Sequence, residues 1–112
     1  PPLPDFSGLP DSALVDVMQM DTTFVLDVKY ATTDNFTKQV LYDCEACLLR
    51  KIVADSLLAA HRFFKSKGYR IKLFDCYRPH SVQFKMWKIV PDDRYVAEPT
   101  KGSMHNRGGA VD

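Results

Sequence analysis

Hydrophobic residues recur at spacings of three and four through the middle of the chain, and this is its strongest periodic signal. The spacing predicts a long helix from Cys44 to Lys67, with Asp43 as its N-cap and Gly68 at its end. Its expected hydrophobic positions are Leu49, Ile52, Val53, Leu57, Ala60 and Phe64. This helix is the element that the sequence defines best.

Alternation of hydrophobic and polar residues, which is the period of a strand, flanks this helix on both sides. Residues 23–30 alternate before the helix, and residues 69–75 alternate after it. Shorter strands are expected at residues 40–42 and at residues 110–112, where a strand has only begun when the printed chain ends. The pattern therefore predicts a small sheet around one long helix.

A second helix is predicted after residues 69–75. Pro79 suits the first position of a helix, and Pro91 cannot continue one. Residues 1–22 are expected to form an irregular, proline-rich lead-in with a short helical turn at Ser12–Met18, and residues 23–112 to form one folded unit. The order of elements predicts an α+β fold, with helices packed on a small mixed or antiparallel sheet that is incomplete at the C-terminus.

Composition narrows the function classes only slightly. The chain has 112 residues, a hydrophobic content of 46% and a net charge of +1, which are ordinary values for a small globular domain. The near-zero charge predicts no nucleic-acid partner, and no apolar run approaches the roughly 18 residues that a membrane span needs.

The segment "GSMHNRGGAVD" places His105 and Asp112 on either side of a glycine-rich turn. Imidazole nitrogen and carboxylate oxygen are both ordinary zinc ligands, and glycines between them would let the chain fold back so that both side chains reach one point. The same pair could instead form a surface hydrogen bond, and the spacing alone does not decide between the two.

Two other polar stretches are candidates for a site. Arg78 lies in the turn between the predicted strand and helix, where it could bind a carboxylate or a developing oxyanion, or could simply pair with Asp75 and fix the turn. The loop "KYATTDNF" contains Tyr30, Asp34 and Asn35, which could line a pocket or form an ordinary polar loop.

Three cysteines are too few for a disulfide scaffold. Cys44 and Cys47 form a C-x-x-C in the first turn of the predicted long helix, and we expect them to be inert packing residues. A thiol redox role is the alternative, while a zinc site that includes Cys76 would lack a regularly spaced fourth ligand. His61 and His80 are expected to be structural or exposed rather than catalytic.

Taken together, the segments "KYATTDNF", "FDCYRPHSVQ" and "GSMHNRGGAVD" resemble the D-alanyl-D-alanine dipeptidases, the zinc enzymes of the vancomycin-resistance type, in serial order and spacing. The similarity runs from about Thr23 to Asp112. The resemblance implies the small zinc-peptidase fold that these enzymes share with D-Ala-D-Ala carboxypeptidases and with the signalling domain of hedgehog proteins.

The resemblance also implies roles for individual residues. His105 and Asp112 match two of the three zinc ligands, and Arg78 matches the arginine that stabilises the tetrahedral intermediate. Cys76 occupies a position that is glycine in many members, and we expect it to be tolerated. The proposed substrate-binding residues, for the two ends of a dipeptide, are Tyr30, Asp34, Asn35, Asp75 and Ser103.

The family's Glu-x-x-His, which supplies the general base and the third ligand, is not found here, because Glu45 and Glu98 both precede the metal motif. We therefore expect the chain to be the N-terminal part of a zinc-dependent D-Ala-D-Ala dipeptidase that is inactive and binds zinc weakly alone. The alternative is a non-catalytic domain that binds a peptide or protein partner. The sequence does not decide between the cell envelope and the cytoplasm of a bacterium as the location of the protein.

Overall fold

The computed structural model describes residues 6–112, so residues 1–5 of the expected lead-in lie outside the described part. Its strands form two small sheets instead of one. β1 (Leu14–Asp16) pairs antiparallel with β3 (Leu48–Arg50), with Val15 opposite Leu49. β2 (Val25–Leu26) pairs in parallel with β4 (Lys72–Leu73). The α+β class is therefore right, and its strands are much shorter than the alternation predicted.

The long helix, α2, spans Lys51–Ser66, so the predicted start at Cys44 and the predicted N-cap at Asp43 are wrong. The preceding residues are used differently: Leu49 is fully buried in β3, and the Cys47 carbonyl accepts a hydrogen bond from the Val17 amide. Leu49 fits both a helical and a strand pattern, which explains why the helix was predicted to begin too early in the sequence.

The predicted strand at residues 23–30 is wrong beyond β2, because Lys29–Ala31 forms a short 3-10 helix, η1. Residues 40–42 form no strand. The turn predicted at Ser12–Met18 divides into β1 and a short helix, α1 (Val17–Met20). The lead-in expected at residues 1–22 therefore contains two of the elements that pack into the fold.

The second helix, α3, spans His80–Ile89, and Pro79 is its N-cap instead of its first residue. A 3-10 helix, η2 (Met104–Arg107), lies within the segment "GSMHNRGGAVD". Residues 110–112 are not a strand, but Asp112 exchanges backbone hydrogen bonds with the chain after β4: its carbonyl accepts from Phe74 at 2.7 Å, and its amide donates to Asp75 at 2.8 Å.

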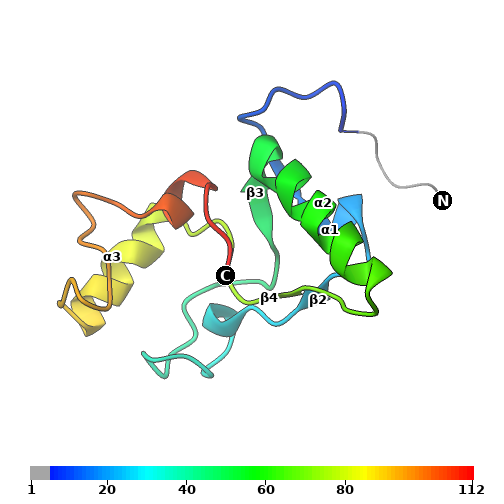
Figure 1. Cartoon of the computed structure of the whole chain (residues 1–112). Coiled ribbons are helices and arrows are strands. Elements are labelled where there is room, and N and C mark those ends of the chain that lie inside the picture. Colours follow the sequence, from blue (N-terminus) through cyan, green and yellow to red (C-terminus); the bar gives the residue numbers. More distant parts are fainter. Residues whose placement is uncertain (1–5) are drawn as a thin grey trace.

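Two hydrophobic clusters lie on either side of this C-terminal segment. In Figure 1, α2 lies with α1, β1 and β3 on one side, α3 and its neighbouring loops lie on the other, and β4 and the C-terminus lie between them. The first cluster has eight buried members, Val15, Val17, Phe24, Cys47, Leu49, Ala54, Leu73 and Cys76. The second has four, Leu41, Val82, Met86 and Val96. Buried Arg78 bonds to Asp75, two residues after Leu73 of the first cluster, and to Gln83, next to Val82 of the second, so this polar group joins the two clusters.

A disulfide joins Cys47 to Cys76, so the prediction that Cys47 is only a packing residue is wrong. The Cα atoms of the two cysteines lie 5.2 Å apart, and 29 positions separate them in sequence. Cys44 keeps a free, exposed thiol. Because Cys47 lies in an extended segment before α2, its C-x-x-C with Cys44 is not in the first turn of a helix.

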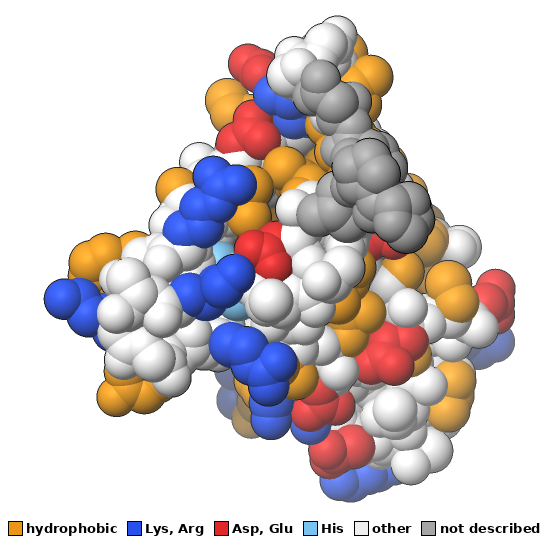
Figure 2. All heavy atoms as spheres, turned by 90° about the vertical axis from the view of Figure 1, so that its right-hand side faces the viewer, with side chains coloured by type: hydrophobic (Ala, Val, Ile, Leu, Met, Phe, Trp, Pro, Cys, Tyr) orange, Lys and Arg blue, Asp and Glu red, His pale blue; other side chains and the backbone are white. Residues whose placement is uncertain are grey.

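The surface mixes charges of both signs. Figure 2 shows one face, on which several Lys and Arg side chains gather on the left of the view, while Asp, Glu and exposed hydrophobic side chains are scattered over the rest. Among residues 6–112, none of the helices combines the length and apolar character needed to cross a membrane.

Candidate active site

The η2 helix fixes His105. Ser103 caps this helix: its Oγ accepts from the His105 amide, while Asn106 reaches back to the Ser103 amide. The His105 ring then lies against the segment after β4, with Nδ1 at 2.9 Å from the Cys76 carbonyl oxygen. A carbonyl can only accept, so Nδ1 carries the proton, and the lone pair of the neutral ring lies on Nε2.

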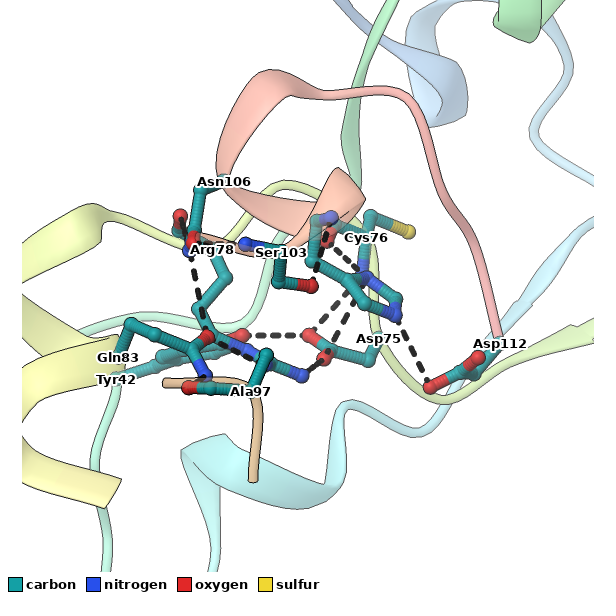
Figure 3. Close-up of polar contacts among 10 residues, drawn as sticks. Tyr42, Asp75, Cys76, Arg78, Gln83, Ala97, Ser103, Asn106 and Asp112 are labelled. Carbon is teal, nitrogen blue, oxygen red and sulfur yellow. Dashed lines mark hydrogen bonds and ion pairs between the residues drawn. The ribbon is translucent and has the colours of Figure 1, made fainter. Parts of the chain in front are cut away.

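Asp112 reaches the same point from the other end of the turn. Its Oδ2 lies 3.4 Å from His105 Nε2 (Figure 3), and its side chain is otherwise exposed. Gly108 makes this approach possible, because its φ of 67° is left-handed and a Cβ there would lie 2.7 Å from Leu14 Cδ2. The Gly108 carbonyl also accepts from the Arg50 amide at 2.9 Å, which ties the turn to β3.

The donor set fits a divalent metal at His105 and Asp112. Ligand atoms of Asp75, His105 and Asp112 all lie within 4.8 Å of one another. The unprotonated Nε2 and the exposed carboxylate have free lone pairs that face each other, and the hydrogen bond at Nδ1 is the usual arrangement behind a metal-bound histidine.

Asp75 is the least suitable metal ligand of the three, because its carboxylate oxygens already accept hydrogen bonds. Its Oδ1 accepts from the Tyr42 hydroxyl at 2.5 Å and from the Cys76 amide at 3.1 Å, and its Oδ2 accepts from Arg78 Nη2 at 2.6 Å. Its side chain is buried as well. The chain thus offers two good ligands, and Asp75 orients its neighbours.

Arg78 is buried at the point where the two clusters meet. Nη2 donates to Asp75, and Nη1 donates to Gln83 at 2.7 Å. Burial opposes its charge, but the Asp75 carboxylate outweighs this effect and raises the pKa of Arg78. Its amide donates to the His105 carbonyl at 2.8 Å, so the arginine is tied to the loop that carries His105. The pairing of Arg78 with Asp75 that the sequence left open is present.

One donor in this network is unused. Nε of Arg78 is buried and has no hydrogen-bond partner in the described part of the chain. An unpaired buried donor costs about 1–3 kcal/mol, so a native site that retains one is expected to gain a partner when it binds a ligand. The guanidinium also lies 5.3 Å from the centre of the Tyr30 ring.

A cavity of about 270 Å³ opens beside Asp112. Among its lining residues are four that the sequence proposed for substrate: Tyr30, Asp34, Asn35 and Asp75. Three that it did not propose, Lys29, Phe36 and Phe74, line it too. Hydrophobic periodicity and polar-loop composition do not show that β4 and the loop after β2 come together, which is why Phe74 was missed.

The proposed substrate residues differ in what they can still bind. The Asn35 side chain is fully used within its own loop: its amide donates to the carbonyls of Lys29, Thr32 and Gln39, and its Oδ1 accepts from Thr37. Asp34 is exposed and pairs with Lys29 at 3.0 Å. Ser103 does not line the cavity, because it caps η2 instead.

Three residues of this hydrogen-bond network were not predicted from the sequence: Tyr42, Gln83 and Asn106. Gln83 joins Arg78 to the Ala97 carbonyl, and Asn106 donates to the Arg78 carbonyl at 3.0 Å. Burial and the Asp75 charge raise the pKa of the Tyr42 hydroxyl, which therefore remains a donor. Gln83 and Asn106 both lie inside the quoted motif segments and could have been found there, whereas nothing around Tyr42 in the sequence marks it.

Comparison with known proteins places this site in a family. A family model described as D-ala-D-ala dipeptidase matches residues 11–111. The chain belongs to the D-Ala-D-Ala dipeptidase family. The match begins before Thr23, so the family resemblance extends over α1 and β1 as well.

Individual D-Ala-D-Ala dipeptidases agree with this assignment. The D-alanyl-D-alanine dipeptidase of Escherichia coli (strain K12) is 34% identical over 99 residues, which cover 88% of this chain and 51% of the relative. Those of Enterococcus faecium and Enterococcus faecalis are 32% and 34% identical over 106 residues, covering 77% of this chain and 52% of each relative. The chain therefore spans about half the length of the relatives that it matches.

Proposed function

We propose that this chain forms part of a zinc-dependent peptidase that hydrolyses the free dipeptide D-alanyl-D-alanine. The observation that carries the proposal is the meeting of His105 Nε2 and Asp112 Oδ2 at 3.4 Å, next to the Arg78 network, in a member of the D-Ala-D-Ala dipeptidase family. All three relatives compared above are named for this activity.

In this proposal His105 and Asp112 hold the metal. Zinc, when bound, supplies a Lewis acid that polarises the peptide carbonyl and activates water near neutral pH. A catalytic zinc typically has three protein ligands, so a third ligand and a general base must come from elsewhere in the protein. We place them in a Glu-x-x-His within the half of the relatives that this chain does not match.

The glutamates in the chain itself are poor candidates for the base. Glu45 accepts a hydrogen bond from the Val28 amide at 3.1 Å, and Glu98 caps its own loop by accepting from the Thr100 amide. Neither residue lines the cavity beside Asp112. This supports a base supplied from outside residues 6–112.

Arg78 would stabilise the oxyanion of the tetrahedral intermediate. Asp75 and Gln83 hold two of its nitrogens, so the guanidinium is oriented before substrate arrives, and the unpaired Nε marks unused donor capacity. A donor that is fixed in advance pays no reorganisation cost at the moment of reaction, which is why such groups contribute strongly to catalysis.

The cavity beside Asp112 would hold the dipeptide. Tyr30 offers a ring face and a hydroxyl, and Asp34 offers a carboxylate for the free amino group. The cavity has a volume of about 270 Å³, close to the lower end of the range for small-molecule pockets, and we expect it to take a free dipeptide. Asn35 would serve by shaping the loop, because its polar atoms are already bonded.

The test measures zinc content and D-Ala-D-Ala hydrolysis in the full-length protein. His105→Ala and Asp112→Ala should each lose bound zinc and lower kcat by at least about 10²-fold. Asp93→Ala is the matched control for Asp112→Ala, since Asp93 is exposed in the loop after α3 and its loss should leave both quantities unchanged. A full-length protein that binds zinc and a D-Ala-terminated peptide without turnover would support the peptide-binding alternative instead.

A further inference from the structure

The Cys47–Cys76 disulfide lies directly behind the metal-binding histidine. The carbonyl oxygen of Cys76 is the acceptor for His105 Nδ1 at 2.9 Å, and the Cys76 amide donates to Asp75. The bridged residue is thus in contact with two of the site's side chains.

The segment that carries these contacts has no regular structure of its own. Residues 74–79 are neither helix nor strand, yet Asp75, Cys76 and Arg78 must all hold their positions there. Backbone hydrogen bonds tie its neighbours: Phe74 to Asp112, and Tyr77 to the Leu48 carbonyl at 2.8 Å. The Tyr77 amide belongs to the same planar peptide as the Cys76 carbonyl, so its bond to Leu48 is one attachment of that peptide to β3, and the disulfide is a second.

The other end of the bridge is firmly anchored. Cys47 is fully buried, its carbonyl accepts from the Val17 amide at 3.1 Å, and β3 begins at the next residue. The bridge therefore transmits the position of the β1–β3 sheet to the peptide that orients His105.

On the basis of the proposed function, we infer that Cys47 is a positioning residue: through its disulfide with Cys76 it holds the carbonyl that fixes the tautomer and direction of the His105 ring. Two consequences follow. The site depends on the oxidised state of the pair, and the protein belongs in a compartment where disulfides persist, such as the cell envelope, because thiols are kept reduced in the cytosol.

The size of the effect follows from comparable groups. Removal of a carbonyl or carboxylate that orients a metal-bound histidine typically lowers metal affinity by about 10-fold to 100-fold. Loss of the bridge leaves the Cys76 carbonyl held by the Tyr77 hydrogen bond alone, so we expect zinc affinity to fall by about 10-fold, at the lower end of this range.

The first experiment removes the bridge in the full-length protein by the double substitution Cys47→Ala/Cys76→Ala. Cys44→Ala is the matched control, because Cys44 is exposed and unpaired. The readouts are the zinc dissociation constant, measured well below the melting temperature of each variant, and the ¹⁵N resonances of the His105 ring in metal-free protein above pH 8. We expect weaker zinc binding and a loss of the pure Nδ1–H tautomer in the double variant only.

A purely stabilising disulfide gives a different result. In that case the double variant has a lower melting temperature, but its His105 tautomer and its zinc affinity are those of the wild type, and the inference is overturned. Cys47→Val/Cys76→Ala, which restores part of the lost volume, provides a second unbridged form in case the first does not fold. Loss of the whole fold in both unbridged variants would also overturn the inference, since the disulfide would then be required for folding in general.

The second experiment changes the redox state without mutation. A water-soluble phosphine supplies two electrons, breaks the S–S bond, takes its oxygen from water and leaves two thiols. Reduced wild type should reproduce the double variant, and reoxidation should restore zinc affinity. The His105 tautomer can be measured without zinc and without substrate, so a protein that fails to hydrolyse D-Ala-D-Ala still tests the bridge. Conversely, normal zinc-dependent hydrolysis of D-Ala-D-Ala by the unbridged protein would overturn this inference and leave the proposed function intact.

Discussion

The guanidinium of Arg78 donates to the carboxylate of Asp75 across 2.6 Å, and both side chains are almost completely buried. Asp75 in turn accepts from Tyr42, and Arg78 donates to Gln83, so the pair is held at both ends. A buried ion pair is costly to break because the partner left behind is an uncompensated charge. The pair therefore affects both the stability of the fold and the chemistry of the site.

If Arg78 acts as proposed, Arg78→Ala should lower kcat of the full-length protein by about 10²–10³-fold, because a preorganised donor to the oxyanion is lost. It should also destabilise the fold by about 3–5 kcal/mol, because Asp75 is left buried and unpaired. Arg94→Ala is the control, since Arg94 pairs with Asp92 on the surface and should change neither quantity measurably. Steady-state kinetics and urea unfolding give the two numbers, and normal kcat in a folded variant would remove Arg78 from the mechanism.

Tyr42→Phe should separate structure from chemistry. The substitution removes only the hydroxyl that donates to Asp75 Oδ1. A buried acceptor that loses its donor costs about 1–3 kcal/mol, so the urea midpoint should fall, while KM should change little because Tyr42 does not line the cavity beside Asp112. Tyr95→Phe, at an exposed tyrosine, should leave the midpoint unchanged. A large rise in KM for Tyr42→Phe would show that this hydroxyl contacts substrate.

His61 should make the fold sensitive to acid. The ring stacks on Phe24, Nδ1 accepts from the Ile71 amide at 3.3 Å, and Nε2 lies 2.8 Å from Thr23 Oγ1. Burial lowers the pKa of His61 below its usual 6.5, although the Asp21 charge opposes this and Lys65 and Arg70 reinforce it. The unfolded chain then binds more protons than the native chain below pH 6.5, so this contribution to stability is complete above pH 6.5 and is lost as pH falls through the lowered value.

The measurement is the urea midpoint between pH 8 and pH 5, compared between wild type and His61→Gln. The wild type should lose more stability over this range than the variant does. Asp21 does not confound the comparison: burial works against its charge, but hydrogen bonds from Thr23 and Lys65 lower its pKa to about 2, outside the range. Equal pH slopes in the two proteins would contradict the assignment.

Gly108→Ala should destabilise the turn between His105 and Asp112 for two reasons, and the same substitution at a second glycine tests one of them alone. At Gly108 the left-handed φ costs an alanine about 1–2 kcal/mol, and the added methyl group meets Leu14 at 2.7 Å, an overpacking that typically costs a further 1–3 kcal/mol. Gly68 also has a left-handed φ but has open space around it, so Gly68→Ala should show the first cost alone. Similar losses of unfolding free energy in both variants would mean that the turn adjusts without strain.

Short-range patterns in the sequence were enough to predict that His105 and Asp112 approach each other and that Arg78 pairs with Asp75, because the residues concerned are close together or lie at the ends of predicted elements. They could not show that Cys47 pairs with Cys76 across 29 positions, since that depends on how β3 meets the segment after β4. They also placed the start of α2 too early, because the same leucine satisfies the period of a helix and the burial of a strand. The errors therefore concern tertiary contacts and element boundaries, and not the overall class.

The two hydrophobic clusters have a consequence for how the molecule unfolds. The only tryptophan, Trp87, packs against the cluster around α3, whereas α2, the longest helix, covers the other cluster. Tryptophan fluorescence and far-ultraviolet circular dichroism therefore observe different halves of the fold. As long as Arg78 and its partners join the halves, both signals should change at one urea concentration, as a two-state transition requires. Without Arg78 the two curves should separate, and the distance between their midpoints would measure how much of the cooperativity of this small protein is due to its active site.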